Sequence, residues 1–251
     1  MSAAPVLEVR NLSRSFGGVQ AVSDLSFEVR GQEVLGLIGP NGAGKTTVLN
    51  LISGVHRPDR GQIFVDGKDA TGLSPQRITR LGVARTFQVV KPFVGLSVAE
   101  NVAMGAMFGP ERLSRQSAMA RAHATLELLG LEAKAQAQTS ELTIADRKRL
   151  ELARALAMRP RIILMDEVLA GLNPSELTRI VDLVENLHRQ GLTIVVIEHV
   201  MRAIMALSTR VLVLVEGRKL VEGDPATVTR DERVIRAYLG DRYVDREVGS
   251  P

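Results

Sequence analysis

The residues from Gly39 to Thr47 have types and spacing that match the pattern G-x-x-x-x-G-K-[ST]. Glycines let backbone N–H groups curl around an anion, a lysine neutralises phosphate charge, and a threonine hydroxyl can ligate Mg²⁺. The alternative is a simple glycine turn between a strand and a helix. We expect nucleotide phosphates to bind at Gly39, Asn41, Gly42, Ala43, Gly44, Lys45, Thr46 and Thr47.

Two further polar groups each follow a short apolar run. Asp166 and Glu167 come after Ile162–Met165, and His199 comes two residues after Thr193–Ile197. In an open α/β sheet, the carboxyl ends of the strands form the edge where ligands bind. An aspartate there can serve Mg²⁺, a glutamate can orient or deprotonate the water that attacks the γ-phosphate, and a histidine can reach that phosphate. Taken singly, each could be an ordinary acidic turn or a structural histidine.

The elements that must position these groups can be read from hydrophobic spacing. Val34–Ile38 predicts a buried strand before the glycine loop, and Thr47–Ile52 has helix-compatible spacing after it. The chain before the loop predicts two antiparallel strands joined by a turn at Phe16, Gly17 and Gly18, and the chain after it a strand near residues 62–67.

Composition changes twice along the chain. From about Ser97 to Met158 the chain is rich in Ala, Glu, Arg, Leu and Met, which predicts helices. After Arg161, strand and helix patterns alternate, which predicts a parallel sheet. The expected fold is α/β with a nucleotide-binding core over residues 1–87 and 160–240, a helical subdomain over 88–159, and a tail over 241–251.

Bulk properties exclude several classes of protein. There is no cysteine among the 251 residues, so disulfides, thiolate zinc sites and thiol nucleophiles are absent. The 32 basic and 28 acidic residues indicate mixed, solvated faces, and 3% aromatic residues without tryptophan argue against a nucleic-acid partner. The apolar runs are too short to span a bilayer, and Met1–Pro5 shows no secretory pattern, so we expect a cytoplasmic location.

The order of motifs resembles the ATP-binding subunit of an ABC transporter over nearly the whole chain. The segments that carry this resemblance are the glycine loop, Thr86–Gln88, Leu142–Asp146, Met165–Glu167, Ala170–Pro174 and His199. A narrower resemblance is to the branched-chain amino acid importers, through Ser15–Gly18, Arg85–Gln88, Ala170–Pro174, Ile197–His199 and Val234–Gly240.

The resemblance implies an ABC ATPase with a P-loop core, an antiparallel β lobe and a helical subdomain, using ATP and Mg²⁺. By position, Glu167 would be the catalytic carboxylate and His199 the γ-phosphate switch, while Thr46, Asp166 and Gln88 would serve Mg²⁺. Gln88 would also pass the state of the site to a transmembrane partner. Phe16 would stack on adenine, the alternative being a core phenylalanine under the turn.

One segment departs from the family's pattern. Where the family has Leu-Ser-Gly-Gly-Gln, this chain has Leu-Thr-Ile-Ala-Asp at residues 142–146. In the family this segment binds the γ-phosphate of the nucleotide on the opposite subunit. Thr143 keeps a hydroxyl for that contact, but the missing glycines and the carboxylate of Asp146 predict a weakened contact through steric bulk and like-charge repulsion. The weakness would fall on the partner's nucleotide.

The expected function is an ATPase that dimerises around two ATP molecules and drives a permease for branched-chain amino acids or a related small carboxylate. Its partners would be transmembrane permease subunits, a second ATP-binding subunit, identical or different, and indirectly a periplasmic solute-binding protein. It would sit on the inner face of the membrane through the permease. The alternative is a soluble ABC ATPase of DNA repair or translation. A GTPase is excluded because no asparagine is followed by lysine.

Overall fold

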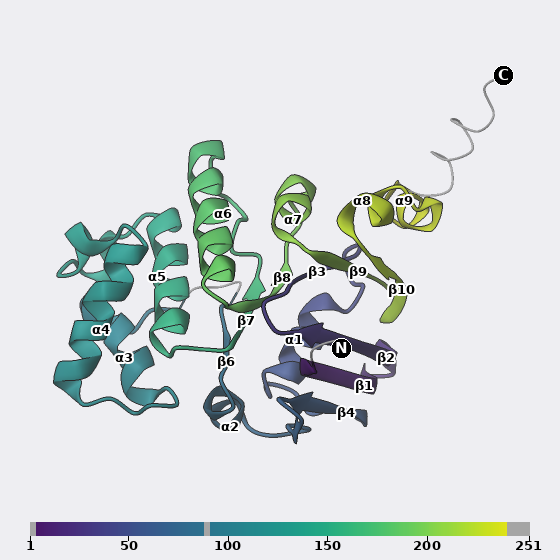
Figure 1. The fold of residues 1–251 in the computed structure, drawn as a ribbon, viewed down its shortest axis with the longest axis horizontal. Coiled ribbons are helices and arrows are strands. Elements are labelled where there is room, and N and C mark those ends of the chain that lie inside the picture. The colour runs from purple at the N-terminus through teal and green to yellow at the C-terminus, as the bar shows by residue number, and fades with distance from the viewer. Residues whose placement is uncertain (1–3, 88–90, 240–251) are drawn as a thin grey trace.

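The computed structural model describes residues 4–87 and 91–239. Their strands form two sheets, seen side by side in Figure 1, with helices packed around the larger one. The smaller sheet has the order β2-β1-β4-β5, and the larger has the order β10-β9-β3-β8-β7-β6. The strands are β1 (Pro5–Phe16), β2 (Val19–Arg30), β3 (Val34–Ile38), β4 (Arg60–Val65), β5 (Lys68–Asp69), β6 (Val83–Arg85), β7 (Ile162–Asp166), β8 (Thr193–Ile197), β9 (Arg210–Val215) and β10 (Arg218–Gly223).

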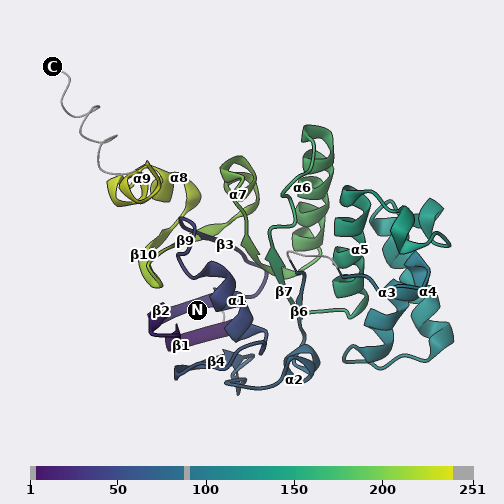
Figure 2. The same ribbon diagram turned by 180° about the vertical axis from the view of Figure 1, so that it is seen from behind.

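The helices follow the predicted change in composition. Three of them, α3, α4 and α5, fall in the segment predicted to be helical, and they lie together at one end of the molecule (Figures 1 and 2). The α-helices are α1 (Lys45–Ile52), α2 (Pro75–Arg80), α3 (Val98–Phe108), α4 (Arg115–Leu128), α5 (Ile144–Ala157), α6 (Pro174–Arg189), α7 (Met201–Leu207), α8 (Pro225–Thr229) and α9 (Glu232–Leu239). Two short 3₁₀ turns, η1 (Glu132–Lys134) and η2 (Thr139–Glu141), precede α5.

The central strands are apolar except for Asp166 at the end of β7 and Thr193 at the start of β8, because both faces of the larger sheet are buried. In β3, Leu35 and Leu37 pack with α1, α2 and the smaller sheet, whereas Val34 and Ile38 pack on the opposite side with the helices from α3 onward. Strands β7 and β8 divide their residues between the two cores in the same alternating way. Covering helices on both sides is the usual reason for continuous apolar runs in parallel strands. The parallel sheet predicted from the sequence is confirmed.

Five short elements were not predicted: α2, β5, β6, β10 and α8. Their patterns are weak, since β5 has two residues, β6 has three, and β10 contains Arg218, Lys219 and Glu222. Ser74-Pro75 and Asp224-Pro225 are helix-start signals that would have located α2 and α8. In the described part of the chain, every helix is too short or too polar to cross a membrane.

Candidate nucleotide-binding and catalytic site

The predicted functional residues meet at one edge of the larger sheet. Strand β8 lies between β3 and β7, and all three run parallel. Their carboxyl ends therefore deliver the glycine loop after β3, His199 after β8, and the pair Asp166 and Glu167 at the end of β7 to the same side. This is the edge at which open α/β sheets bind ligands.

The glycine loop leads directly into α1, whose first residue is Lys45. The Lys45 ammonium donates hydrogen bonds to the carbonyls of Gly39 and Pro40, at 2.7 and 2.9 Å. Lys45 as a whole is 6% exposed, and burial lowers the pKa of its amine. An anion placed in the loop would give this buried cation a charged partner, beside the N-terminus of a helix.

Two glycines of the loop are required by close backbone approach. A Cβ on Gly39 would lie 2.1 Å from the Leu214 carbonyl oxygen, and one on Gly44 would lie 2.3 Å from that of Ala21. Both residues also have positive φ, 152° and 97°. Contacts with β9 and β2 thus fix the loop's path, and any side chain at these two positions would displace it.

Asp166 is 1% exposed and ion-paired with Arg85, whose Nη2 lies 3.0 Å from Oδ2. Arg85 also donates to the side chains of Asn50 and Ser53 on and after α1. The second Asp166 oxygen, Oδ1, is buried without a hydrogen-bond partner. Burial raises the pKa of Asp166, and the Arg85 hydrogen bond and charge partly offset that rise.

A cavity of about 490 Å³ is lined by Thr46 and Asp166 together with Asn50 and Arg85. No cluster of three or more His, Cys, Asp or Glu side chains in the described residues could hold a metal ion. Mg²⁺ bound with a nucleotide needs fewer protein ligands than such a cluster, because one or two protein oxygens hold it together with phosphates and waters. The unpaired Oδ1 of Asp166 and the Thr46 hydroxyl fit that requirement.

Glu167 and His199 are brought into direct contact. Nε2 of His199 lies 2.6 Å from Oε1 of Glu167. The Glu167 side chain is 14% exposed and that of His199 is 46% exposed, so the pair lies where the site opens to solvent. A carboxylate and an imidazole in contact beside a phosphate loop can together orient and deprotonate a water molecule.

Phe16 ends β1 at the turn into β2 and is 38% exposed. The Arg14 guanidinium carbon lies 4.7 Å from the Phe16 ring centroid, and the His56 ring meets Phe16 edge-on at 5.1 Å. Residue Ala21 of the adjoining strand contacts the glycine loop, so Phe16 lies on the strand pair that borders the site. The exposed ring can stack on a base, and adenine stacking stays a prediction.

Thr143 lies elsewhere on this subunit, as the N-cap of α5. Its hydroxyl accepts from the backbone N–H of Asp146 and donates to the Asp146 carboxylate. That carboxylate is buried and ion-paired with Lys134 and Arg149. Burial alone would raise the pKa of Asp146, but these hydrogen bonds and charges lower it.

The sequence predicted that the Asp146 carboxylate would repel a phosphate. That prediction was wrong, because Lys134 and Arg149 neutralise this carboxylate inside the helix cap. The bulk that replaces the first signature glycine is nevertheless present, since Ile144 is 67% exposed at the first turn of α5. A bulky side chain at this helix start restricts close approach of a phosphate to the backbone.

Gln88 lies outside the described residues.

Three residues to which the sequence assigned no role also contact the site: Arg85, Lys148 and Glu198. Arg85 and Glu198 lie inside segments that carried the family resemblance, and Lys148 lies two residues after the signature. Their position in or next to these motifs was the one sequence feature that could have marked them as site residues. Their partners are far away in sequence, so pattern alone could not pair them.

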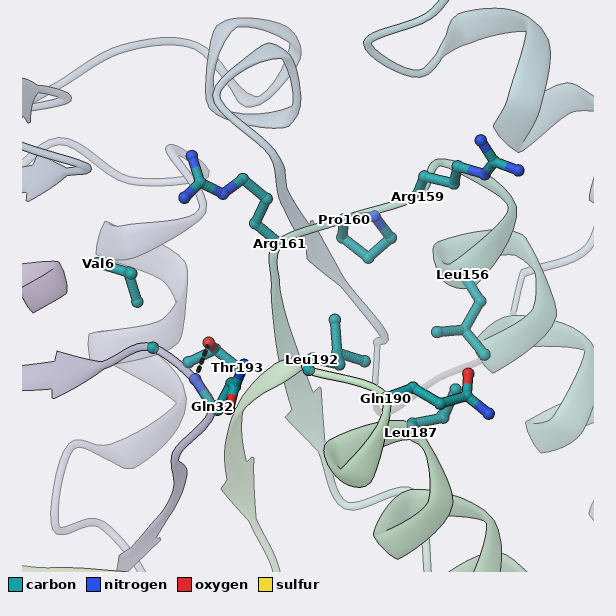
Figure 3. A pocket seen from close by; sticks show the side chains of 12 residues that line it. Val6, Gln32, Leu156, Arg159, Pro160, Arg161, Leu187, Gln190, Leu192 and Thr193 are labelled. Atoms are coloured by element: carbon teal, nitrogen blue, oxygen red, sulfur yellow. Dashed lines mark hydrogen bonds between the residues drawn. The ribbon is translucent and has the colours of Figure 1, made fainter.

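A second hollow, of about 600 Å³, lies at the opposite edge of the sheet, near the start of β7 and β8 (Figure 3). Its charged side chains point apart: Arg161 pairs with Asp66 at 2.6 Å and Arg159 with Glu111 at 3.7 Å. The dashed line marks the 3.0 Å bond from the Gln32 N–H to the Thr193 hydroxyl. These side chains do not converge on a common point, so the hollow offers no reaction centre.

Comparisons with known proteins agree with this geometry. Residues 22–170 match the family model for ABC transporters, and residues 218–244 match a model described as branched-chain amino acid ATP-binding cassette transporter. A curated relative, the high-affinity branched-chain amino acid transport ATP-binding protein LivG of Salmonella typhimurium, is 39% identical, over 94% of this chain and 98% of its own.

Solved structures also match the fold. A nucleotide-free ATP-binding cassette from an ABC transporter superposes with a TM-score of 0.86 at 29% identity, covering 95% of this chain and 100% of that one. An ATP-binding cassette in a dimeric post-hydrolysis state bound to ADP and phosphate superposes with a TM-score of 0.79 at 25% identity, covering 87% and 98%.

Proposed function

This chain belongs to the ATP-binding proteins of ABC transporters, and we propose that it is the ATP-hydrolysing subunit of an importer for branched-chain amino acids or a related small carboxylate. One observation carries the chemistry: a phosphate loop and the pair of Glu167 and His199 lie at the same sheet edge. The transported solute is supported by the similarity to LivG and by the match of residues 218–244.

The proposed reaction is an in-line attack of water on the γ-phosphorus of ATP. A new P–O bond forms from the water, the bond between the γ-phosphorus and the bridging oxygen breaks, and ADP and phosphate are released. Glu167 takes the water's proton, and His199 orients Glu167 and contacts the γ-phosphate. Lys45 exchanges its bonds to the Gly39 and Pro40 carbonyls for the β- and γ-phosphates.

Mg²⁺ would be held by Thr46 and Asp166, with Gln88 as a further candidate. When bound, it would neutralise charge that develops on the phosphate oxygens. The Asp166 carboxylate is already held in place without the ion. Arg85 binds its Oδ2, and Oδ1 stays available as a ligand for Mg²⁺. Phe16 would take the adenine ring at the outer end of the site.

The subunit would act as a dimer, as the related post-hydrolysis cassette does. Two ATP molecules at the interface would hold the halves together, and hydrolysis would release them and drive the permease. The exposed Ile144 and the cap that occupies Thr143 favour a partner that is a different ATPase subunit with an intact signature. A cytoplasmic position on the inner face of the membrane, through the permease, follows from this role.

The test is Glu167→Gln, which keeps the size of the side chain but removes its basic oxygen. Turnover should fall by about 100-fold or more, in the range of a lost general base, while ATP is retained and dimers accumulate. Unchanged turnover would refute the catalytic assignment. Purification through a tag on this chain should also recover permease subunits, whereas recovery of DNA or ribosomes without them would favour the soluble alternative.

A further inference from the structure

We propose that Glu198 and Lys148 are positioning residues that hold the backbone of Glu167 and so aim its carboxylate. The inference rests on the proposed function, because it takes Glu167 as the catalytic base. Neither residue belongs to the phosphate loop or contacts it among the described residues. Each instead contacts the short segment that follows β7.

Glu198 lies between the end of β8 and His199 and is 2% exposed. Its Oε1 accepts a hydrogen bond of 2.6 Å from the backbone N–H of Leu169. The next residue, His199, contacts the Glu167 side chain, and the preceding residue, Ile197, accepts from the Glu167 N–H at 2.9 Å. Three consecutive residues therefore hold one short loop at three points.

Lys148 holds the same loop from a helix. It lies on α5, the helix that begins with the altered signature, and its ammonium donates a hydrogen bond of 2.8 Å to the Glu167 carbonyl oxygen. The Glu167 peptide groups are thus bound at the N–H by β8 and at the C=O by α5. A movement of α5 relative to the sheet would pull on this carbonyl.

The need for such support is visible in the backbone of Glu167, which has φ of 52°. This left-handed conformation is strained for a residue with a side chain, and it persists only where surrounding contacts determine it. The bonds from Ile197, Lys148 and His199 supply those contacts directly. Glu198 adds to them by fixing Leu169, two residues farther along the chain.

The charges around Glu198 suit a positioning role. Its second oxygen, Oε2, is buried without a hydrogen-bond partner. Lys148 from α5 and Glu167 from the loop are the charged groups that act on this carboxylate, with opposite effects. Glu198 therefore bonds the catalytic loop to the histidine segment, and the charge of Lys148 on the signature helix acts on it.

The experiment compares Glu198→Ala, Glu198→Gln and Lys148→Met in the assembled transporter, purified through a tag on this chain. We expect Glu198→Ala and Lys148→Met to lower kcat about tenfold or more, because small misplacements of a reacting group are costly. ATP affinity, measured with a fluorescent ATP analogue, should change less than about twofold, because these substitutions leave the contacts that bind ATP in its ground state intact. Glu198→Gln retains an oxygen that can accept from Leu169 and should restore most of kcat.

Glu185→Ala and Lys68→Met, at surface positions on α6 and β5, are matched controls and should behave like the wild type. Wild-type kcat in both Glu198→Ala and Lys148→Met would overturn the proposal. Parallel loss of ATP affinity and thermal stability, without rescue by Glu198→Gln, would overturn it in favour of a purely structural role. If Glu167→Gln leaves turnover intact, the proposed function itself fails, which distinguishes the two failures.

Discussion

The buried carboxylate of Glu198 predicts a pH-dependent stability that one substitution should remove. Burial, only partly opposed by the Leu169 hydrogen bond and the charge of Lys148, raises the pKa of Glu198 from 4.5 to about 7. Between these values the folded state holds a proton that the unfolded state has lost. The free energy of unfolding therefore falls as the pH rises through this window.

The magnitude follows from the same two values. At about 1.4 kcal/mol per tenfold change in ionisation constant, full ionisation of Glu198 in the folded state costs about 3 kcal/mol. Glutamine at this position keeps an acceptor for Leu169 and cannot ionise. The stability of Glu198→Gln relative to the wild type should therefore improve by about 2 to 3 kcal/mol between pH 5 and pH 8.

The assay is urea unfolding of the nucleotide-free chain at half-unit steps from pH 5 to pH 8, with the free energy of unfolding obtained at each pH. Glu185→Gln, a substitution on the exposed side of α6, is the control, and its difference from the wild type should stay flat. A flat difference for Glu198→Gln would refute the reasoning, because it would mean that the carboxylate is as well solvated in the folded chain as in the unfolded one.

Two other predictions concern the two nucleotide sites and the altered signature. In the proposed dimer the altered signature of this chain would face the partner's nucleotide, whereas an intact signature of the partner would face the nucleotide at Lys45. Lys45→Ala should therefore lower the ATPase activity of a mixed dimer more than the matching lysine change in the partner. Equal losses in steady-state turnover would count against unequal sites. Asp146→Asn removes the charge that Lys134 and Arg149 neutralise and should lower the free energy of unfolding by about 1 to 3 kcal/mol at neutral pH. The loss should shrink as the pH falls through the lowered pKa of Asp146, where the wild type also loses that charge, and an unchanged urea midpoint would contradict the buried pairing.

Much of this fold was predictable because its signals are local. An apolar run, a glycine loop with lysine and threonine, and a following helix lie within about twenty residues, and the structure has them as β3, the loop and α1. The runs before Asp166 and Glu198 likewise became β7 and β8. Short strands with both faces buried must be apolar throughout, so the sequence carried their positions directly.

The sequence by itself also determined which chemical groups reach the carboxyl edge of the sheet, since each follows the end of a strand. Only the tertiary structure decided how those groups are held. Arg85 pairs with an aspartate 81 positions away, Lys148 binds the Glu167 carbonyl across a helix-to-strand contact, and Asp146 is neutralised by Lys134 from a preceding turn. Such pairings depend on packing between elements, because a buried charge or a strained backbone needs a partner at a distance that only the folded chain sets.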